Sequence, residues 1–413
     1  MATTPSTVAE PVSRHSALST GFLARHRYSS RLRAVAYPGT AVFIAVFLAV
    51  VMVTHRSPAD STDPLGGATS REPAPSAAGE PDANTCAALV AEMPLPDRLA
   101  QRLMIGVDPG APAAARALER DTHVGGLFIG GNATQILQGS ALTVIQSAAL
   151  YPIAVAVDDE GGRVQRIDTL HGSMPSARQM GTMPPGEVRR IGAQRGRELK
   201  ARGVTVDFAP VLDLGAHPGN AVIGDRAFSA DPAVVVAHAG AFAAGLRDAG
   251  ITPVFKHFPG HGRANGDSHR KLVTTPPLAS LRVMDLPPYE QLLTEGPSVV
   301  MVGHLNVPGL TNGVPATLSP PAYRLLRDEI GFTGVTITDD LGGMRAVSDR
   351  YGIVDAVTTA LESGADIALW TSAEKLDDVL ARLMTETEAN RLPVADTDAS
   401  VARILEMKGV CRG

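Results

Sequence analysis

The sequence predicts an α/β protein whose folded part is a (β/α)8 TIM barrel. Three observations favour this fold: short apolar runs recur along the chain, helix-like segments separate them, and polar residues follow the ends of most runs. Continuous apolar runs are typical of parallel strands covered on both faces, and intervening helices supply the crossovers. The eight runs are 103–107, 126–129, 153–157, 204–212, 251–255, 298–302, 335–337 and 366–370.

The segments between the runs carry the end signals of helices. Asp231-Pro232 begins an alanine-rich segment that stops at Gly250, and Ser319-Pro320 begins another that stops at Gly331. A capping residue, a proline at the first position and a glycine after the last turn follow one another in this order in helices. An open doubly wound sheet is the alternative, but no glycine fingerprint follows the first run. We therefore expect one barrel domain over residues 86–413.

The composition limits the partners of the chain. Its 413 residues are 44% hydrophobic, which suffices for a sizeable core. The net charge of −5 supplies no basic field for a polyanion, so nucleic acid is not expected as a partner. We expect no cofactor and a monomeric protein.

The N-terminal region differs from the rest. Residues 34–54 carry no charge and, at a helical rise of ~1.5 Å per residue, are long enough to cross a bilayer. Positive charge precedes this stretch and only Arg56 follows it closely, which predicts that residues 1–33 are cytoplasmic and the barrel extracytoplasmic. The prediction is thus a single-pass anchor in the cell membrane. A cleaved signal peptide, with a weak small-x-small site at 57–59, is the alternative.

Residues 55–85 contain almost no large apolar side chain, which predicts a disordered linker. Cys86 and Cys411 bracket everything that follows. In an oxidising compartment, two cysteines at the ends of one domain are candidates for a single disulfide. Two unpaired thiols are the alternative.

A glycine-rich loop after the fifth run, Lys256 to His269, contains three histidines, a lysine and an aspartate. The Asp267-x-His269 pair can hold an imidazole with its proton placed for acid/base work near neutral pH. His257, His261 and this pair also offer metal donors. The charge of Lys256 and the flexible glycines argue against a metal cage, so we expect no metal.

Two further positions suggest chemistry. Asp339 follows the seventh run, so its carboxylate should point into the barrel mouth as a nucleophile or metal ligand. A helix N-cap is the alternative, and Asp339 and Asp340 can divide the two roles. After the third run, Asp158 to Arg166 offers carboxylates and arginines that suit a polyhydroxylated ligand, and Arg226 is similar. A surface salt-bridge cluster is the alternative for these residues.

Together, these motifs resemble a known family. Lys-His-Phe-Pro-Gly-His-Gly followed by Asp-Ser-His, the Asp158–Arg166 motif, Gly-Asp-Arg-x-Phe-Ser and Thr-Asp-Asp-Leu resemble the NagZ-type β-N-acetylhexosaminidases of glycoside hydrolase family 3. The resemblance runs from about Cys86 to the C-terminus. It implies a single-barrel enzyme that removes terminal β-linked N-acetylglucosamine, often from peptidoglycan fragments. An outward-facing barrel would meet the cell wall itself.

The resemblance also implies roles for individual residues. Asp339 would be the nucleophile, His269 the acid/base and Asp267 its partner. The sugar would be held by Asp158, Arg166, Arg226, Lys256 and His257. The sequence departs from the family pattern at Asp159, where glutamine is usual, and at Gly342-Gly343, where serine is more usual.

The implied mechanism is that of a retaining glycosidase, in which a carboxylate nucleophile and a proton donor face each other about 5 Å apart across the bond. Here His269 would replace the usual second carboxylic acid, with Asp267 favouring its charged form and fixing its tautomer. Participation of the substrate's acetamide is the mechanistic alternative. A broad β-glucosidase and a non-catalytic wall-binding barrel are the functional alternatives.

Overall fold

The computed structural model describes residues 85–131, 134–215, 217–219 and 221–411. The cytoplasmic segment, the membrane anchor and, apart from Thr85, the linker that the sequence predicts lie outside these residues. Within the described part of the chain, no helix combines the length and the apolar character that crossing a bilayer requires.

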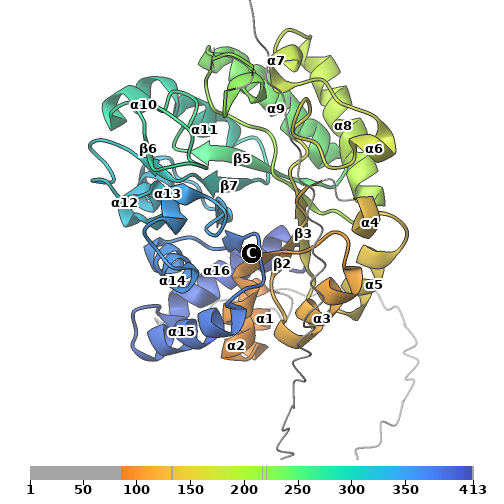
Figure 1. Ribbon diagram of the computed structural model, residues 1–413, viewed down its shortest axis with the longest axis vertical. Coiled ribbons are helices and arrows are strands. Elements are labelled where there is room, and N and C mark those ends of the chain that lie inside the picture. The colour runs from red at the N-terminus through yellow and green to blue at the C-terminus, as the bar shows by residue number, and fades with distance from the viewer. Residues whose placement is uncertain (1–84, 132–133, 216, 220, 412–413) are drawn as a thin grey trace, which may run out of the picture. The chain divides into compact units, whose positions relative to one another are not determined.

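Eight parallel strands form a nearly closed barrel in the order β10-β1-β2-β3-β4-β5-β7-β9. A bridge between Ile337 and Ile367 joins the two edges. Figure 1 shows the helices arranged around these strands. Each of the eight apolar runs overlaps one barrel strand, so the predicted (β/α)8 architecture is confirmed. The strands are β1 Leu103–Gly106, β2 Gly126–Phe128, β3 Ala154–Val157, β4 Val206–Asp207, β5 Thr252–Phe258, β7 Val299–Val302, β9 Thr336–Thr338 and β10 Ala368–Trp370.

Side chains of each strand alternate between two hydrophobic layers. One layer fills the barrel interior and includes Val254, Met301 and Ile337. The other lies between strands and helices and includes Val155 and Trp370, packed with helix residues. Because both faces of the strands are buried, the runs are continuously apolar rather than alternating.

The helices lie mostly between successive strands. They are α1 Cys86–Glu92, α2 Leu95–Gln101, α3 Pro112–Thr122, α4 Thr134–Leu137, α5 Ala141–Ala148, α6 Asp168–His171, α7 Ala177–Met180, α8 Pro185–Ala201, α9 Pro232–Asp248, α10 Leu278–Met284, α11 Pro287–Leu292, α12 Pro320–Arg324, α13 Arg345–Ser348, α14 Ile353–Ser363, α15 Leu376–Glu388 and α16 Val394–Met407. A small parallel pair, β6 Val273–Thr274 and β8 Leu305–Asn306, lies outside the barrel sheet.

The two helices predicted from their end signals differ in regularity. In α9 the side chain of Asp231 accepts from the N–H of Ala233 at 2.9 Å, and Gly250 follows the helix end in a left-handed conformation, as predicted. The second helix begins at Pro320 as expected but continues from Leu325 to Glu329 as a π-helical turn.

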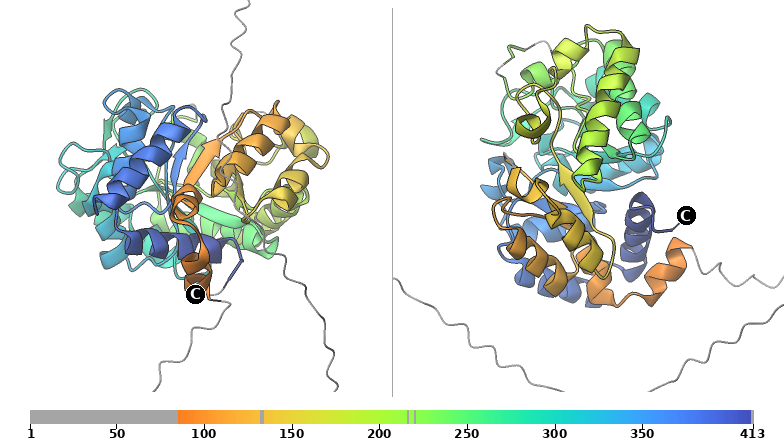
Figure 2. Two further views of the ribbon diagram at one scale, coloured as in Figure 1. Left: turned by 90° about the horizontal axis from the view of Figure 1, so that it is seen from below. Right: turned by 90° about the vertical axis from the view of Figure 1, so that its right-hand side faces the viewer.

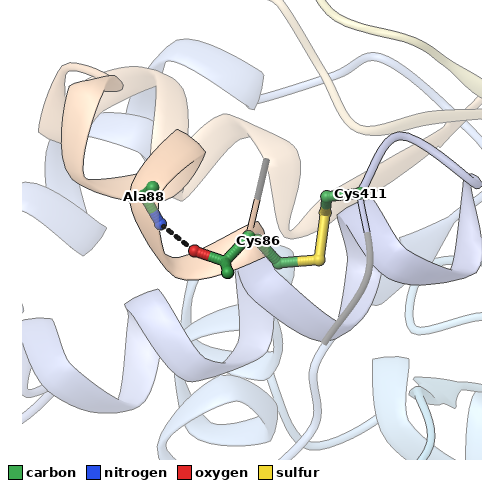
Figure 3. The surroundings of a disulfide bond; sticks show 4 residues. Cys86, Ala88 and Cys411 are labelled. Atoms are coloured by element: carbon green, nitrogen blue, oxygen red, sulfur yellow. Dashed lines mark hydrogen bonds between the residues drawn. A yellow bond between two sulfur atoms is a disulfide. The ribbon is translucent and has the colours of Figure 1, made fainter. Parts of the chain in front are cut away.

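The ends of the domain are joined covalently. The Sγ atoms of Cys86 and Cys411 are 2.08 Å apart and form a disulfide, so both cysteines are paired. Figure 2 shows α1 and α2 beside α16, which places the two cysteines close together. Figure 3 shows the bond and, next to it, the capping hydrogen bond from the N–H of Ala88 to Oγ1 of Thr85. The disulfide thus links the first helix to the segment after the last one.

Candidate active site

A cavity of about 400 Å³ opens at the carboxyl ends of the barrel strands. This is the face on which (β/α)8 barrels carry their active sites. Seven of the eight residues that the sequence predicts as catalytic or sugar-binding line it, and the eighth, Asp267, contacts one of them. The seven are Asp158, Arg166, Arg226, Lys256, His257, His269 and Asp339.

Asp339 follows β9 directly. Its N–H donates to the carbonyl of Val302 on the neighbouring strand at 3.0 Å, which fixes its backbone at the barrel mouth. Burial alone would raise the pKa of its carboxyl group. The charges of His257 and His304 and the N–H of Asp340 outweigh burial and lower the pKa to about 2. The Asp339 carboxylate is therefore ionised at any physiological pH.

The carboxylate of Asp340 has a structural role. It accepts hydrogen bonds from the N–H groups of Gly342 and Gly343 at 3.0 and 3.1 Å, and from Oγ1 of Thr371 at 2.8 Å. A Cβ atom on Gly343 would lie 2.5 Å from Oδ2 of Asp340, so this turn requires a glycine. Gly342 is less constrained, because a Cβ atom there would lie 3.4 Å from the nearest atom, Cβ of Trp370. The N-cap residue of the next helix, α13, is Met344, so the alternative prediction of a helix N-cap is wrong for both aspartates.

The Asp267–His269 pair is formed within one loop. Oδ1 of Asp267 lies 2.8 Å from Nδ1 of His269 and accepts from the backbone N–H of His269 at 2.9 Å. Partial burial opposes ionisation of Asp267, but the hydrogen bonds from His269 outweigh it and lower its pKa. An ionised Asp267 makes Nδ1 of His269 the donor, which leaves Nε2 as the atom available to a substrate.

The predicted sugar-binding residues form a network of ion pairs. Nζ of Lys256 lies 3.0 Å from Oδ1 of Asp158 and 2.5 Å from Oε1 of Glu160. Arg226 makes two hydrogen bonds to Glu160, at 2.7 and 2.8 Å, and Arg166 lies 3.3 Å from Asp158. The charged groups that face the cavity thus hold each other in a salt-bridge cluster, and sugar binding by them stays a prediction.

Glu160 connects this network without lining the cavity. Its burial favours the neutral acid, but the charges of Arg226 and Lys256 outweigh burial and lower its pKa. The sequence marked Glu160 only as a carboxylate that could bind hydroxyls. Its contacts instead identify it as the counterion that fixes the two cations.

Asp213 is the main site residue whose function the sequence did not predict. Its Oδ2 lies 2.7 Å from Nδ1 of His257. Burial raises the pKa of Asp213, but the charge and hydrogen bond of His257 outweigh it, so the pKa is lowered. Asp213 follows the fourth apolar run, and that position was its only signal in the sequence. The pairing with His257 required the adjacent placement of β4 and β5.

The apolar floor of the cavity also had no separate signal. Phe128 and Phe208 stack with ring centroids 5.3 Å apart and an interplanar angle of 10°, and Met301 and Leu369 complete this side. These residues lie within or next to the apolar runs. A continuous run does not reveal which side chains face the barrel interior.

The three loop imidazoles have separate hydrogen-bond partners. His257 contacts Asp213, His261 contacts Ser268, and His269 contacts Asp267. Among the described residues, no group of three His, Cys, Asp or Glu side chains is arranged to hold a metal ion. That the protein needs no metal stays a prediction, which a chelator would test.

Comparison with known proteins shows the family. Residues 95–407 match the glycosyl hydrolase family 3 N-terminal domain. The chain is 44% identical over 388 residues to a protein named β-hexosaminidase LpqI from Mycobacterium tuberculosis, an alignment that covers 91% of this chain and 98% of that protein.

Comparison with solved structures supports the same family. The structure of M. tuberculosis LpqI has a TM-score of 0.77 and 47% identity, covering 80% of this chain and 97% of that chain. A family 3 glycosyl hydrolase from Mycobacterium smegmatis has a TM-score of 0.76 and 49% identity, covering 78% of this chain and 99% of that chain. A family 3 β-N-acetylglucosaminidase from Paenibacillus has a TM-score of 0.71 and 31% identity, covering 78% of this chain and 64% of that one.

The family match therefore identifies the barrel as a carbohydrate-active enzyme. The chain belongs to glycoside hydrolase family 3 and is a glycoside hydrolase.

Proposed function

We propose that this enzyme is a retaining β-N-acetylglucosaminidase that releases terminal N-acetylglucosamine from cell-wall glycans. One observation carries the proposal: an ionised carboxylate, Asp339, and an imidazole oriented by a carboxylate, His269, line the same cavity. These are the two groups that retaining hydrolysis needs. The names of the M. tuberculosis and Paenibacillus relatives support the choice of sugar.

In the first step, an Asp339 oxygen attacks the anomeric carbon while Nε2 of protonated His269 gives its proton to the departing glycosidic oxygen. The C–O bond to the leaving group breaks and a glycosyl-aspartate ester forms. In the second step, neutral His269 removes a proton from water, which attacks the same carbon and releases Asp339. Asp267 stabilises the charged imidazole that donates the proton in the first step and that forms again in the second.

The remaining residues of the cavity suit the hydroxyl groups of one sugar ring. Asp158 accepts hydrogen bonds, Lys256, Arg166 and Arg226 donate them, and His257 has Nδ1 tied to Asp213 so that Nε2 faces the site. Such bonds accelerate the reaction only where they strengthen as positive charge develops on the ring.

The test uses the full-length protein with aryl β-N-acetylglucosaminides and the matched aryl β-glucosides. We expect turnover of the first substrates only, and an NMR time course in which the β-anomer of the sugar appears first. Preferential turnover of glucosides would support the β-glucosidase alternative, and no turnover of either would support a binding module. Release of the α-anomer first would exclude retention. A strong rate loss on fluorination of the N-acetyl group would indicate participation of the acetamide instead of Asp339.

We further propose that residues 34–54 anchor the barrel to the outer face of the cell membrane. The proposal rests on the uncharged stretch and the arginines before it. A reporter fused after Arg56 should be active only in an extracytoplasmic compartment. A mature protein that starts near Asp60 would show a cleaved signal peptide instead.

A further inference from the structure

We propose that the hydrogen bond between His261 and Ser268 positions the acid/base pair for catalysis, which makes these two residues positioning residues of the active site. This inference rests on the proposed role of Asp267 and His269 as the acid/base pair. It concerns residues that neither donate a proton to the substrate nor bind the sugar in the proposed mechanism.

The loop that carries the pair is fixed at its base and exposed at its tip. It connects β5 to β6. Near its start, a Cβ atom on Gly262 would lie 1.9 Å from the carbonyl oxygen of Leu214, so the backbone packs directly on the segment after β4. At the tip, the side chains of His269 and Arg270 are 59% and 84% exposed. An exposed tip needs a specific contact to keep His269 in one place.

Ser268 supplies that contact. It lies between Asp267 and His269, yet it is only 1% exposed. Its Oγ lies 2.9 Å from Nε2 of His261, which is 3% exposed. A buried hydroxyl–imidazole pair in the middle of an exposed dyad fixes the backbone from which both dyad side chains extend.

His261 is itself held by the sugar site. The backbone N–H of His261 donates to Oδ1 of Asp213 at 2.6 Å, and Oδ2 of the same carboxylate accepts from Nδ1 of His257. Burial lowers the pKa of His261, only partly opposed by the charge of Asp213, so the ring is neutral near pH 7. Among the described residues, Nδ1 of His261 has no partner, so Ser268 is the polar contact of this ring. The chain of contacts thus runs from His257 through Asp213 and His261 to Ser268.

The other side of the loop contacts the segment after Asp339. The N–H of Ala346 donates to the carbonyl of Ser268 at 3.2 Å, and the N–H of Arg345 to the carbonyl of His269 at 3.3 Å. These bonds tie the dyad to α13, which follows the turn after the proposed nucleophile. Ser268 is therefore held from both sides, by His261 and by α13. Its placement sets the position of His269 relative to both the sugar and Asp339.

The test compares Ser268→Ala with wild type on two aryl N-acetylglucosaminides, one with a poor and one with an activated leaving group. Protonation of the leaving group matters mainly for the first, and kcat/KM reports on the step in which it occurs. We expect kcat/KM for the poor leaving group to fall about three- to tenfold, as for the loss of one hydrogen bond. The kcat/KM of the activated substrate should fall less than about twofold. His261→Leu should give the same pattern, and the double variant should lose no more than either single one.

Ser298→Ala is the matched control. Ser298 precedes β7 at the opposite end of the barrel, and its buried Oγ has no hydrogen-bond partner among the described residues. This variant should resemble wild type on both substrates. If His261→Leu does not fold, Ser268→Ala alone carries the test, because it keeps the backbone bonds to α13.

The outcomes separate the two proposals. Equal losses on both substrates, or no loss on either, would overturn the positioning role while wild-type activity upheld the proposed function. A wild-type protein without N-acetylglucosaminidase activity would overturn the proposed function and the positioning role together.

Discussion

The N–H of Asp340 donates to Oδ1 of Asp339 at 2.9 Å, so two adjacent aspartates share one hydrogen bond but have different surroundings. The carboxylate of Asp340 accepts from Gly342, Gly343 and Thr371 and shapes the turn. The carboxylate of Asp339 faces the cavity. The backbone N–H of the turn-forming Asp340 therefore helps to keep Asp339 ionised and correctly placed.

Asp339→Asn should abolish turnover without unfolding the protein. The loss of a nucleophile should lower kcat on the order of 10⁵–10⁶-fold. Asp340→Asn is the matched control and should lower thermal stability while retaining measurable turnover. A 5-fluoro sugar should label Asp339 covalently, as peptide mass mapping would show. A label on Asp340, or no label, would contradict the assignment of the nucleophile.

The acid dependence of stability should include a contribution from Asp339. Its pKa is about 2 in the folded protein against an ordinary 3.8. A lowered pKa stabilises the fold above the ordinary value, and this stabilisation is lost as pH falls towards the folded value. Between pH 4 and 2, the free energy of unfolding should fall more steeply for wild type than for Asp339→Asn. Parallel curves from denaturant titrations would show that the pKa of Asp339 is not lowered.

His269→Ala should slow the hydrolysis of substrates with poor leaving groups by on the order of 10²–10⁴-fold, the range expected of a general acid. The rate of hydrolysis of activated aryl glycosides should fall less, because their leaving groups need no protonation. Asp267→Asn should give a smaller loss of the same pattern, since the imidazole remains but its charged form loses a counterion. Equal losses on both substrate types would indicate that His269 is only structural.

Asp213→Asn should destabilise the protein and weaken catalysis. The buried carboxylate accepts from Nδ1 of His257 and from the N–H of His261, and an amide cannot serve both equally. We expect a loss of about 1–3 kcal/mol in the free energy of unfolding. Asp248→Asn, which breaks an exposed pair with Arg189, should leave the unfolding midpoint unchanged. An Asp213 variant as stable as wild type would contradict the structural role.

Loss of the Cys86–Cys411 disulfide should lower stability and leave turnover unchanged. The residues are 325 positions apart in sequence, and the chain-entropy model gives an upper limit of ~5–6 kcal/mol for so long a loop. Neither cysteine lines the cavity. Denaturant titrations with and without reductant, together with non-reducing mass mapping of exported protein, provide the test. Free thiols at both positions in exported protein would contradict the presence of the disulfide.

The sequence alone determined the architecture and most of the site's members. The eight runs are continuous because their strands are buried on both faces, and this is a local property of the chain. Strand ends are local too, so Asp339, Lys256 and Asp158 could be assigned to one face before any contact was known. The Asp267–His269 pair is also local, because its two residues are two positions apart.

Tertiary structure decided which of these groups support one another. Asp213 and His257 are 44 positions apart, and Arg226 and Glu160 are 66 apart, so only the adjacency of strands brings them into contact. The register of β5 against β7 shifts between Phe255 and Phe258, and both Lys256 and His257 line the cavity. Phe128 and Phe208 form the apolar floor because barrel closure turns these side chains inward. Local patterns fix strand positions, but register and closure fix side-chain partners.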